Sequence, residues 1–313
     1  MKTTLFDADG QDCDVTGHEP DPTSLGDGRL LWIDLGREAA VAVQLLPLPI
    51  RNTVEALSTA TQAQFYDEAC GFSVELAAAH HAKSGTSCVF IAKDNWMVTI
   101  CDDRPALFDD YLRGDRGAGL KGRMSALSLA ASLISIFNEA TRTELATIEN
   151  QADNLDEEIL RARERRSLLL TLATLRRRTS YLRQIVAGQR AAVLSLSRAD
   201  TLAQIADADH EPLRQLRADY ERLSDEVTRV RETIIGSFEL YTARVAHDAN
   251  RLLKALTIAT VITGVVGAVA GIFGMNFDTP ISHSGLTGFH IVTWSMIGIS
   301  VAVAAVAVWR RWF

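Results

Sequence analysis

The sequence predicts an α+β domain followed by a long helical stalk and two C-terminal transmembrane helices. Two apolar runs without a charged residue predict the transmembrane helices: residues 255–277, about 23 positions, and residues 291–308, about 18. Apolar residues at helical spacing, repeated with few interruptions from Met124 onward, predict the stalk and its neighbours. Short strand-like segments before residue 110 predict the α+β domain.

These patterns divide the chain into consecutive segments. The predicted segments are a loosely ordered lead-in (1–28), an α/β domain (29–123), an antiparallel helical pair (124–211), a stalk helix (212–254), a first span (255–277), an external loop (278–290), a second span (291–309) and a basic tail (310–313).

Basic residues at the ends of the two spans predict how the hairpin is oriented. Arg251 and Lys254 precede the first span, Arg310 and Arg311 follow the second, and the loop between the spans has no Lys or Arg. By the positive-inside rule, both chain ends are cytoplasmic and the loop is outside. We therefore expect a multi-pass protein of the cell (inner) membrane, with the lipid bilayer as one of its partners.

Composition narrows the class of function. The formal charge of −7 argues against a nucleic-acid partner, which needs a basic surface, but it does not exclude cations as cargo. The sequence contains no nucleophile elbow, P-loop or zinc-ligand cluster, so it predicts neither an enzyme nor a bound cofactor. Four cysteines without CxxC spacing, Cys13, Cys70, Cys88 and Cys101, are expected to be reduced thiols of a cytosolic domain.

Within the N-terminal domain, three segments have the composition of strands and two read better as helices. Residues 92–95 form a polar stretch of hairpin-turn length between the second and third strands. The expected strands are 30–35, 87–91 and 96–101, and the expected helices are 53–64 and 72–82.

The helical region contains one predicted break, at residues 200–212. Pro212 suits the first turn of a new helix, which could continue to Phe277 as about 65 residues, on the order of 100 Å. The Leu and Arg repeat of residues 155–196 is interpreted as a coiled-coil face with solvated charges, without a catalytic role.

One side of the first span carries a stripe of polar and small residues. Because two spans cannot enclose an aqueous path, a conducting protein would have to be an oligomer with this stripe facing its axis. A stripe with Asn, Thr and Gly but no carboxylate suits a cation that keeps much of its water shell, such as Mg²⁺. The candidate pore-lining residues are Asn250, Leu253, Leu256, Thr260, Gly264, Gly267 and Gly271.

Close helix packing explains the same stripe equally well. Gly267 and Gly271 form a GxxxG pair, which lets helices approach each other in lipid. Asn276 favours conduction in part, because a ring of its amide oxygens at the outer boundary could hold a hydrated ion.

Gly274-Met275-Asn276 at the end of the first of two C-terminal spans resembles the signature of the CorA family of divalent-metal-ion transporters. Asn250 to Thr257 looks like the start of the family's pore helix, and residues 31–35 resemble the first strand of its cytoplasmic domain. The match is strongest after Leu175 and weak over residues 36–87.

This resemblance implies a funnel-shaped homopentamer whose first spans form the pore. It also implies that Gly274, Met275, Asn276 and Asp278 bind and select hydrated cations outside, and that cytoplasmic metal regulates the pore. Glu239 stands where the family usually has a regulatory stalk carboxylate, although a solvated stalk charge explains it equally well. Its candidate partners are Asp94, Asp102 and Asp103.

Two departures from the family pattern affect the identity of the ion. Gly264-Val265 replaces the usual bulky apolar residue and Pro, which leaves Leu253 and Leu256 as the apolar constriction. The loop has its acid, Asp278, before Pro280 rather than after it. The uncharged stripe and the family resemblance together imply Mg²⁺ influx, with Co²⁺ or Ni²⁺ as further cargo. A proton-coupled zinc transporter of the ZntB-like branch and a non-conducting coiled-coil scaffold remain alternatives.

Overall fold

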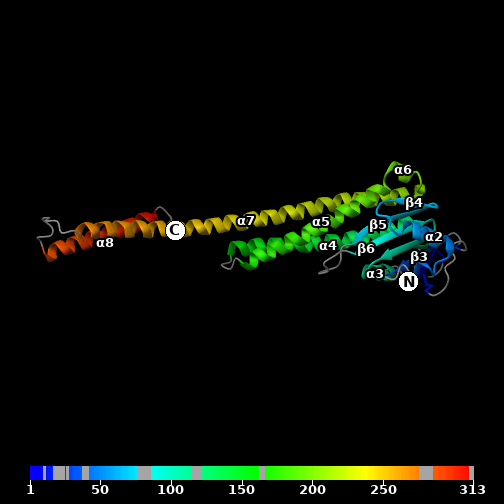
Figure 1. The fold of residues 1–313 in the computed structure, drawn as a ribbon, viewed down its shortest axis with the longest axis horizontal. Helices are drawn as coiled ribbons and strands as arrows, with labels where there is room; N and C mark the ends of the chain where they lie inside the picture. Colours follow the sequence, from blue (N-terminus) through cyan, green and yellow to red (C-terminus); the bar gives the residue numbers. More distant parts are fainter. Residues whose placement is uncertain are drawn as a thin grey trace. The chain divides into compact units, whose positions relative to one another are not determined.

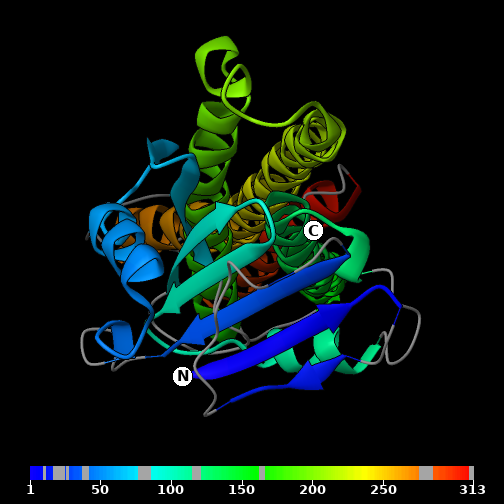
Figure 2. The same ribbon diagram turned by 90° about the vertical axis from the view of Figure 1, so that its right-hand side faces the viewer.

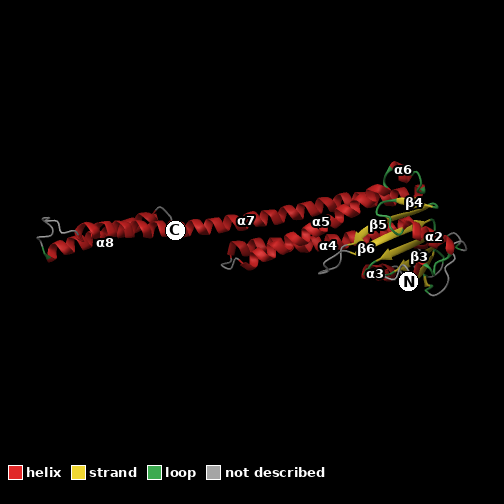
Figure 3. Cartoon of the chain, viewed as in Figure 1, coloured by secondary structure: helices red, strands yellow, loops and turns green. Residues whose placement is uncertain are grey.

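The structure of the chain, a computed structural model, describes residues 1–9, 12–16, 25, 28–36, 42–76, 86–114, 121–161, 166–274 and 285–309. The chain divides into two compact units, Met1–Leu155 with Glu164–Gly236, and Asp156–Arg163 with Ser237–Phe313. All the strands lie in the first unit, whereas the described part of the second unit is helical (Figure 3).

The first unit is built on a seven-stranded mixed sheet with the strand order β2-β1-β3-β7-β6-β5-β4. Strands β3 and β7 run parallel, and the other neighbours are antiparallel. In Figure 2 the strands lie side by side with helices α4 and α5 behind them. The strands are β1 (Lys2–Asp7), β2 (Cys13–Asp14), β3 (Arg29–Leu35), β4 (Gln64–Tyr66), β5 (Ala69–Leu76), β6 (Thr86–Lys93) and β7 (Trp96–Cys101).

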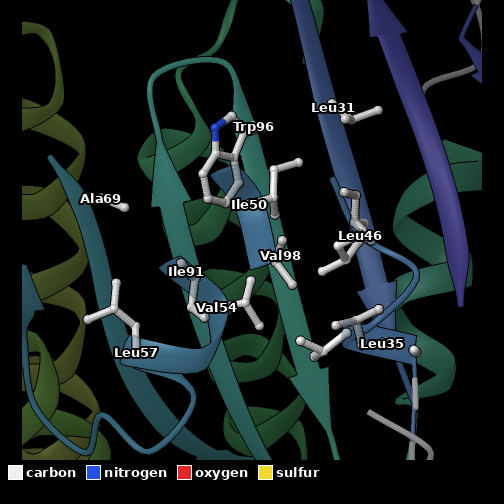
Figure 4. Close-up of a cluster of buried hydrophobic side chains, with 13 residues drawn as sticks. Leu31, Leu35, Leu46, Ile50, Val54, Leu57, Ala69, Ile91, Trp96 and Val98 are labelled. Carbon is white, nitrogen blue, oxygen red and sulfur yellow. The ribbon is translucent and has the colours of Figure 1, made fainter. Parts of the chain in front are cut away.

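One face of the sheet is covered by helix α2 (Leu48–Leu57). Pro49 lies in the first turn of this helix, where its missing N–H needs no partner. Ile50 and Val54 of α2 pack against Ile33 and Val98 of the sheet in a buried apolar cluster (Figure 4). Alternate residues of a strand point to opposite faces, so the odd-numbered residues of β3 belong to this layer.

The other face of the sheet packs against α3 (Ala106–Gly114), α4 (Ala126–Arg161) and α5 (Arg166–Leu196). Phe108 of α3 meets Trp32 of β3 edge-on with ring centroids 5.1 Å apart, and it meets Phe137 of α4 at 5.7 Å. Gln189 of α5 donates to the backbone oxygen of Glu75 at the end of β5 at 2.6 Å. Because both faces are covered, β3 is buried from Leu30 to Leu35.

Three further helices follow α5: α6 (Ala199–Leu202), α7 (Asp207–Gly274) and α8 (Leu286–Trp309). Helix α7 continues without a break for 68 residues (Figure 1). In the first unit, Arg142 of α4 forms ion pairs with Asp219 at 3.7 Å and Glu226 at 3.5 Å on α7. These contacts join α4 to the helix that carries the first predicted span.

The prediction that residues 1–28 are loosely ordered is wrong for Lys2–Asp7, which form strand β1. Strand β1 pairs antiparallel with β3 along its whole length, from Lys2 opposite Asp34 to Asp7 opposite Arg29. Thr3 and Thr4 are buried there. The strand contains only two large apolar residues, so its own composition did not reveal it, and the pairing with β3 determines its conformation.

Both helices predicted in the domain are displaced or wrong. Helix α2 begins at Leu48, directly after Pro47, so residues 53–64 contain only its end. The last of these residues, Gln64, is the first residue of β4. Residues 72–76 belong to β5, which pairs with β6 at seven consecutive positions. Alanine-rich residues 77–82, which favoured a helix, lie outside the described residues. The pairing of β5 with β6 outweighs local helix propensity.

The remaining differences concern a helix boundary and the cysteines. Helix α7 begins at Asp207, five residues before the predicted start, so Pro212 lies inside it. Cys88 and Cys101 are disulfide-bonded, which contradicts the expectation of four reduced thiols, while neither Cys13 nor Cys70 takes part in a disulfide. The β6–β7 hairpin places this pair opposite each other.

Candidate functional site

Two helical segments, Asp207–Ile272 of α7 and Leu286–Val303 of α8, are long and apolar enough to cross a membrane, judged by length and composition. Their large apolar side chains are mostly exposed: Leu252 is 73% exposed, Ile272 65% and Trp294 69%. The core of a water-soluble protein would bury such side chains. Lipid or neighbouring apolar helices would cover them at no comparable penalty.

The predicted pore-lining stripe lies on an exposed face of α7. Every member is exposed, from Asn250 through Thr260 to Gly274. On the face predicted to point away from the pore, Ile258 is buried and Ile262, Val265 and Val269 are half-buried, although Val261 and Ile272 of the same set are exposed. The chain itself therefore covers part of the predicted packing face and leaves the stripe open.

The glycines of the stripe make no close approach to any described part of the chain. A Cβ atom added at Gly264, Gly267, Gly271 or Gly274 would have no heavy atom within 4 Å apart from its own helix and chain neighbours. Intrachain GxxxG packing therefore does not explain these glycines among the described residues. These glycines are therefore open to contact with water or with a neighbouring copy of the chain.

The threonines of this helix present oxygen acceptors. Thr257 Oγ1 donates to the carbonyl oxygen of Leu253 at 2.9 Å, and Thr260 Oγ1 donates to that of Leu256 at 2.8 Å. Each hydroxyl proton is thus used within the helix, which leaves the oxygen lone pairs to accept. A hydrated cation presents O–H donors outward, so such acceptors match its water shell.

Of the predicted external ion site, only Gly274 belongs to the described residues. Gly274 is the last residue of α7 and is exposed. Met275, Asn276 and Asp278 lie outside the described residues.

Glu239, the predicted regulatory carboxylate, is exposed on α7. Asp94 lies in the β6–β7 turn, Asp102 and Asp103 follow β7, and all three are exposed. No group of three or more His, Cys, Asp or Glu residues suited to a metal ion occurs in the described part of the chain. A regulatory metal at Glu239 would need ligands from beyond these residues.

A buried polar network at the centre of the sheet was missed by sequence reasoning. Trp32 Nε1 donates to Thr99 Oγ1 at 3.0 Å, and Thr99 Oγ1 donates to Asp34 Oδ1 at 2.8 Å. The second oxygen of Asp34 accepts from Nε of Arg104. Asp34 is only 4% exposed, and burying a carboxylate is costly unless it is paired and hydrogen-bonded. The contacts with Thr99 and Arg104 offset this cost. The signal available was an acid in the middle of an otherwise apolar strand.

The network continues to α3 and β1 through Arg104. Its Nη1 donates to Asp109 Oδ2 at 2.5 Å, while Lys2 Nζ donates to Asp109 Oδ1 at 2.9 Å. Hydrogen bonds from Arg104 and then Lys2 lower the pKa of Asp109 to about 2. Four elements, β1, β3, β7 and α3, are thereby held together by charge-assisted contacts.

Known proteins resemble this chain in sequence and in fold. A cobalt/magnesium transport protein CorA of Thermotoga maritima is 26% identical over 209 residues, 65% of this chain and 57% of the relative. The protein of the same name from Methanocaldococcus jannaschii is 26% identical over 170 residues, 53% of each chain. The matched regions thus span little more than half the length of these curated relatives.

A solved structure extends the similarity of the fold to almost the whole chain. The complete CorA magnesium transporter of Methanocaldococcus jannaschii superposes with a TM-score of 0.77 at 19% identity, covering 98% of this chain and 97% of that one. The family described as CorA-like Mg²⁺ transporter protein matches residues 28–311, which confirms the predicted resemblance to the CorA family. The chain therefore belongs to the CorA-like Mg²⁺ transporter protein family.

Proposed function

We propose that this protein transports divalent metal cations across the cell membrane, with Mg²⁺ influx as its main activity and Co²⁺ or Ni²⁺ as further cargo. Membership of the family and the names of its curated relatives support the class of cargo. The observation that carries the proposal is the exposed face of α7 from Asn250 to Gly274. This face has acceptor oxygens and glycines but no carboxylate.

The conducting unit is an oligomer, because two spans per chain cannot enclose a water-filled path. In the proposed arrangement the first spans of several copies surround an axis, and the family resemblance implies five copies in a funnel. The exposed stripe then faces the axis, while α8 and the opposite face of α7 meet lipid. The open space around Gly264, Gly267 and Gly271 supports this placement.

The residues of the stripe suit an ion that keeps most of its water. Mg²⁺ gives up water reluctantly, and dehydrating it would require several well-placed oxygen ligands. Thr260 and Asn250 would instead accept hydrogen bonds from the water shell. Leu253 and Leu256, 60% and 64% exposed, would form the narrow apolar ring that closes the path by excluding water.

The membrane potential supplies the driving force in this proposal. Moving one charge is worth about 2.3 kcal/mol per 100 mV, so a divalent ion gains about twice that amount. The basic residues Arg251, Lys254, Arg310 and Arg311 support cytoplasmic chain ends. The amides of Asn276, together with Gly274, Met275 and Asp278, would receive the hydrated ion outside.

Cytoplasmic divalent ions regulate the pore in this proposal, with Glu239 contributing a carboxylate and a second copy of the chain contributing further ligands. Binding between copies would stabilise the closed state when internal Mg²⁺ is high. Limited proteolysis of the purified oligomer with and without millimolar Mg²⁺ tests this part. Metal-dependent protection is expected for wild type and lost in Glu239→Ala, whereas identical cleavage of wild type under both conditions would count against it.

Ion uptake into proteoliposomes tests the transport proposal directly. The purified protein is reconstituted under an imposed potential with dyes for Mg²⁺ and Zn²⁺, as wild type, Asn276→Ala and the control Asn154→Ala. Asn154 is exposed on α4, outside the predicted spans. Potential-driven Mg²⁺ uptake that is lost only in Asn276→Ala is the expected result.

Two other outcomes would replace the proposal. Zn²⁺ uptake that follows a pH gradient would make the protein a zinc transporter of the ZntB-like kind. Absence of any flux from an intact wild-type oligomer would favour a membrane-anchored scaffold.

A further inference from the structure

Cys88 of β6 and Cys101 of β7 are joined across two neighbouring antiparallel strands, with their Cα atoms 4.2 Å apart. The backbone explains this closeness. The Asp102 N–H donates to the Ser87 carbonyl oxygen at 3.2 Å, so Ser87 and Asp102 form a hydrogen-bonded pair. Hydrogen-bonded and non-hydrogen-bonded pairs alternate along an antiparallel ladder, so the neighbouring pair, Cys88 and Cys101, is non-hydrogen-bonded. In such a pair the Cα atoms lie about 4.5 Å apart. The hairpin itself therefore brings the two sulfurs within bonding reach.

The other two cysteines are not placed to compete for this bond. Cys70 of β5 lies opposite Ala92 of β6, four residues along that strand from Cys88. Its burial raises the pKa of the Cys70 thiol to about 12, which keeps it protonated and poorly nucleophilic. Cys13 lies on β2, the strand at the far edge of the sheet. Pairing is thus specific to Cys88 and Cys101.

The cystine lies beside the polar network of the sheet. Cys101 follows Thr99 by two positions on β7, so both side chains point to the same face, and Thr99 donates to Asp34. Three residues after Cys101, Arg104 bridges Asp34 and Asp109. A covalent bond at Cys101 therefore fixes the end of β7 between two attachments of this network.

We propose that Cys88 and Cys101 form a reversible thiol–disulfide couple that exchanges with the glutathione pool and stabilises the β6–β7 hairpin when oxidised. The proposal rests on the cytoplasmic orientation given under the proposed function. Disulfides in a reducing compartment are usually transient and redox-sensing rather than permanent. Both residues are at most 1% exposed, so exchange requires local opening of the hairpin and is slow.

The exchange balances with glutathione disulfide as the oxidant. One protein thiolate attacks a sulfur of glutathione disulfide, which releases one glutathione thiolate and leaves a mixed disulfide. The second protein thiolate attacks the protein sulfur of that bond and releases the second glutathione thiolate. Two protein thiols lose two protons and two electrons, and one glutathione disulfide is reduced to two glutathione molecules.

The test equilibrates the purified full-length oligomer with mixtures of reduced and oxidised glutathione. Acid quenching is followed by unfolding, alkylation of free thiols and mass spectrometry of the cysteine peptides. Cys88 and Cys101 are expected to become protected together in oxidising mixtures and alkylated together in reducing ones, while Cys70 stays alkylated throughout. Two results would overturn the couple: alkylation of both residues in the most oxidising mixture, or their protection in the most reducing one.

Thermal unfolding supplies a second readout. The oxidised wild type should melt about 5 °C higher than the reduced protein, because the cross-link restricts the unfolded chain. Cys101→Ser should abolish this redox-dependent difference, and Cys70→Ser should retain it; equal melting of oxidised and reduced wild type would contradict stabilisation of the hairpin by the bond. Neither readout uses ion flux, so failure of the couple leaves the transport proposal standing, and absence of transport leaves the couple measurable.

Discussion

The carboxylate of Asp209, in the first turn of α7, accepts a hydrogen bond from the Ser128 hydroxyl of α4 at 2.6 Å. The same Oδ1 atom accepts from the hydroxyl of Ser125, whose oxygen in turn accepts from the Ser128 backbone N–H at 3.0 Å. Asp209 is only 6% exposed. The start of the long helix is therefore fixed to the start of α4 by a buried, charge-assisted contact.

Asp209→Ala should lower the free energy of unfolding by about 1–3 kcal/mol, because the two serine hydroxyls lose their buried acceptor. The matched control is Asp207→Ala, since Asp207 lies in the same helical turn but its side chain is fully exposed. Denaturant unfolding of the detergent-solubilised protein measures both. Equal effects of the two substitutions would show that only the helix dipole is at work.

Gly122→Ala should destabilise the first unit by about 1–3 kcal/mol or more through overpacking. A Cβ at Gly122 would lie 2.3 Å from the Ala8 backbone nitrogen and 2.8 Å from the Gly28 carbonyl oxygen, and backbone atoms cannot move aside cheaply.

Gly188→Ala is the control for this substitution. Gly188 lies inside α5, and apart from its own helix and chain neighbours no heavy atom of the described residues lies within 4 Å of a Cβ added there. The substitution should therefore be neutral or stabilising by up to about 1 kcal/mol. Thermal melts distinguish the two variants, and a neutral Gly122→Ala would contradict the close approach of Gly122 to the backbone of Ala8 and Gly28.

The charge of Asp109 should contribute to stability only above a low pH. Its pKa is lowered from 3.8 to about 2 in the folded protein, so its contribution is complete above about pH 4 and is lost as the pH falls toward 2. The stability difference between wild type and Asp109→Asn should therefore shrink over this range.

A double-mutant cycle with Arg104→Gln identifies the cause of this pH dependence. Arg104 is the largest contributor to the lowered pKa, so its removal should flatten the pH dependence of the Asp109→Asn effect. Because the Asp109 side chain is 43% exposed, solvent screening keeps the energy small. An unchanged pH dependence in the Arg104→Gln background would mean that Lys2 alone holds the carboxylate.

Thr260→Val should reduce Mg²⁺ uptake severalfold while the oligomer stays intact, because it replaces an outward acceptor oxygen by a methyl group of similar size. Thr293→Val is the matched control, since Thr293 lies on α8, which the proposed arrangement places away from the axis. Uptake into proteoliposomes measures both variants. Equal loss in the two would attribute the effect to helix stability rather than to the conduction path.

Leu256→Ala should increase Mg²⁺ leak when internal Mg²⁺ is high, because a wider and more hydrated ring no longer excludes water. Val261 is also exposed but lies on the face predicted to point away from the pore, which makes Val261→Ala the control. Uptake into proteoliposomes preloaded with Mg²⁺ measures the leak. If Leu256→Ala leaks no more than wild type, Leu256 is not part of the constriction.

The periodic and apolar features of the chain could be predicted because they are local. The two spans follow from uncharged runs, and α7 follows from apolar spacing, although its start at Asp207 was placed five residues late. The strand at residues 96–101 and its partner before it were found because an apolar run on each side of a short polar turn is a local hairpin signal. Their turn proved shorter than predicted, with Lys93 already paired to Trp96.

The missed features depend on partners far away in the chain. Strand β1 has little apolar character and exists because β3 pairs with it, and β5 was mistaken for a helix because alanines follow it. The signature residues Met275, Asn276 and Asp278 lie outside the described residues, so their roles stay predictions.

By itself, the sequence determined the two membrane spans, the long helix and the polar stripe on one side of it, because hydrophobicity and helical phase are properties of neighbouring residues. Only the tertiary structure decided that Thr99 and Arg104 donate hydrogen bonds to the buried carboxylate of Asp34 and that Cys88 forms a disulfide with Cys101. Asp34 lies 65 residues before Thr99 and 70 before Arg104. Such pairs are created by the strand order of the sheet, which local patterns do not contain.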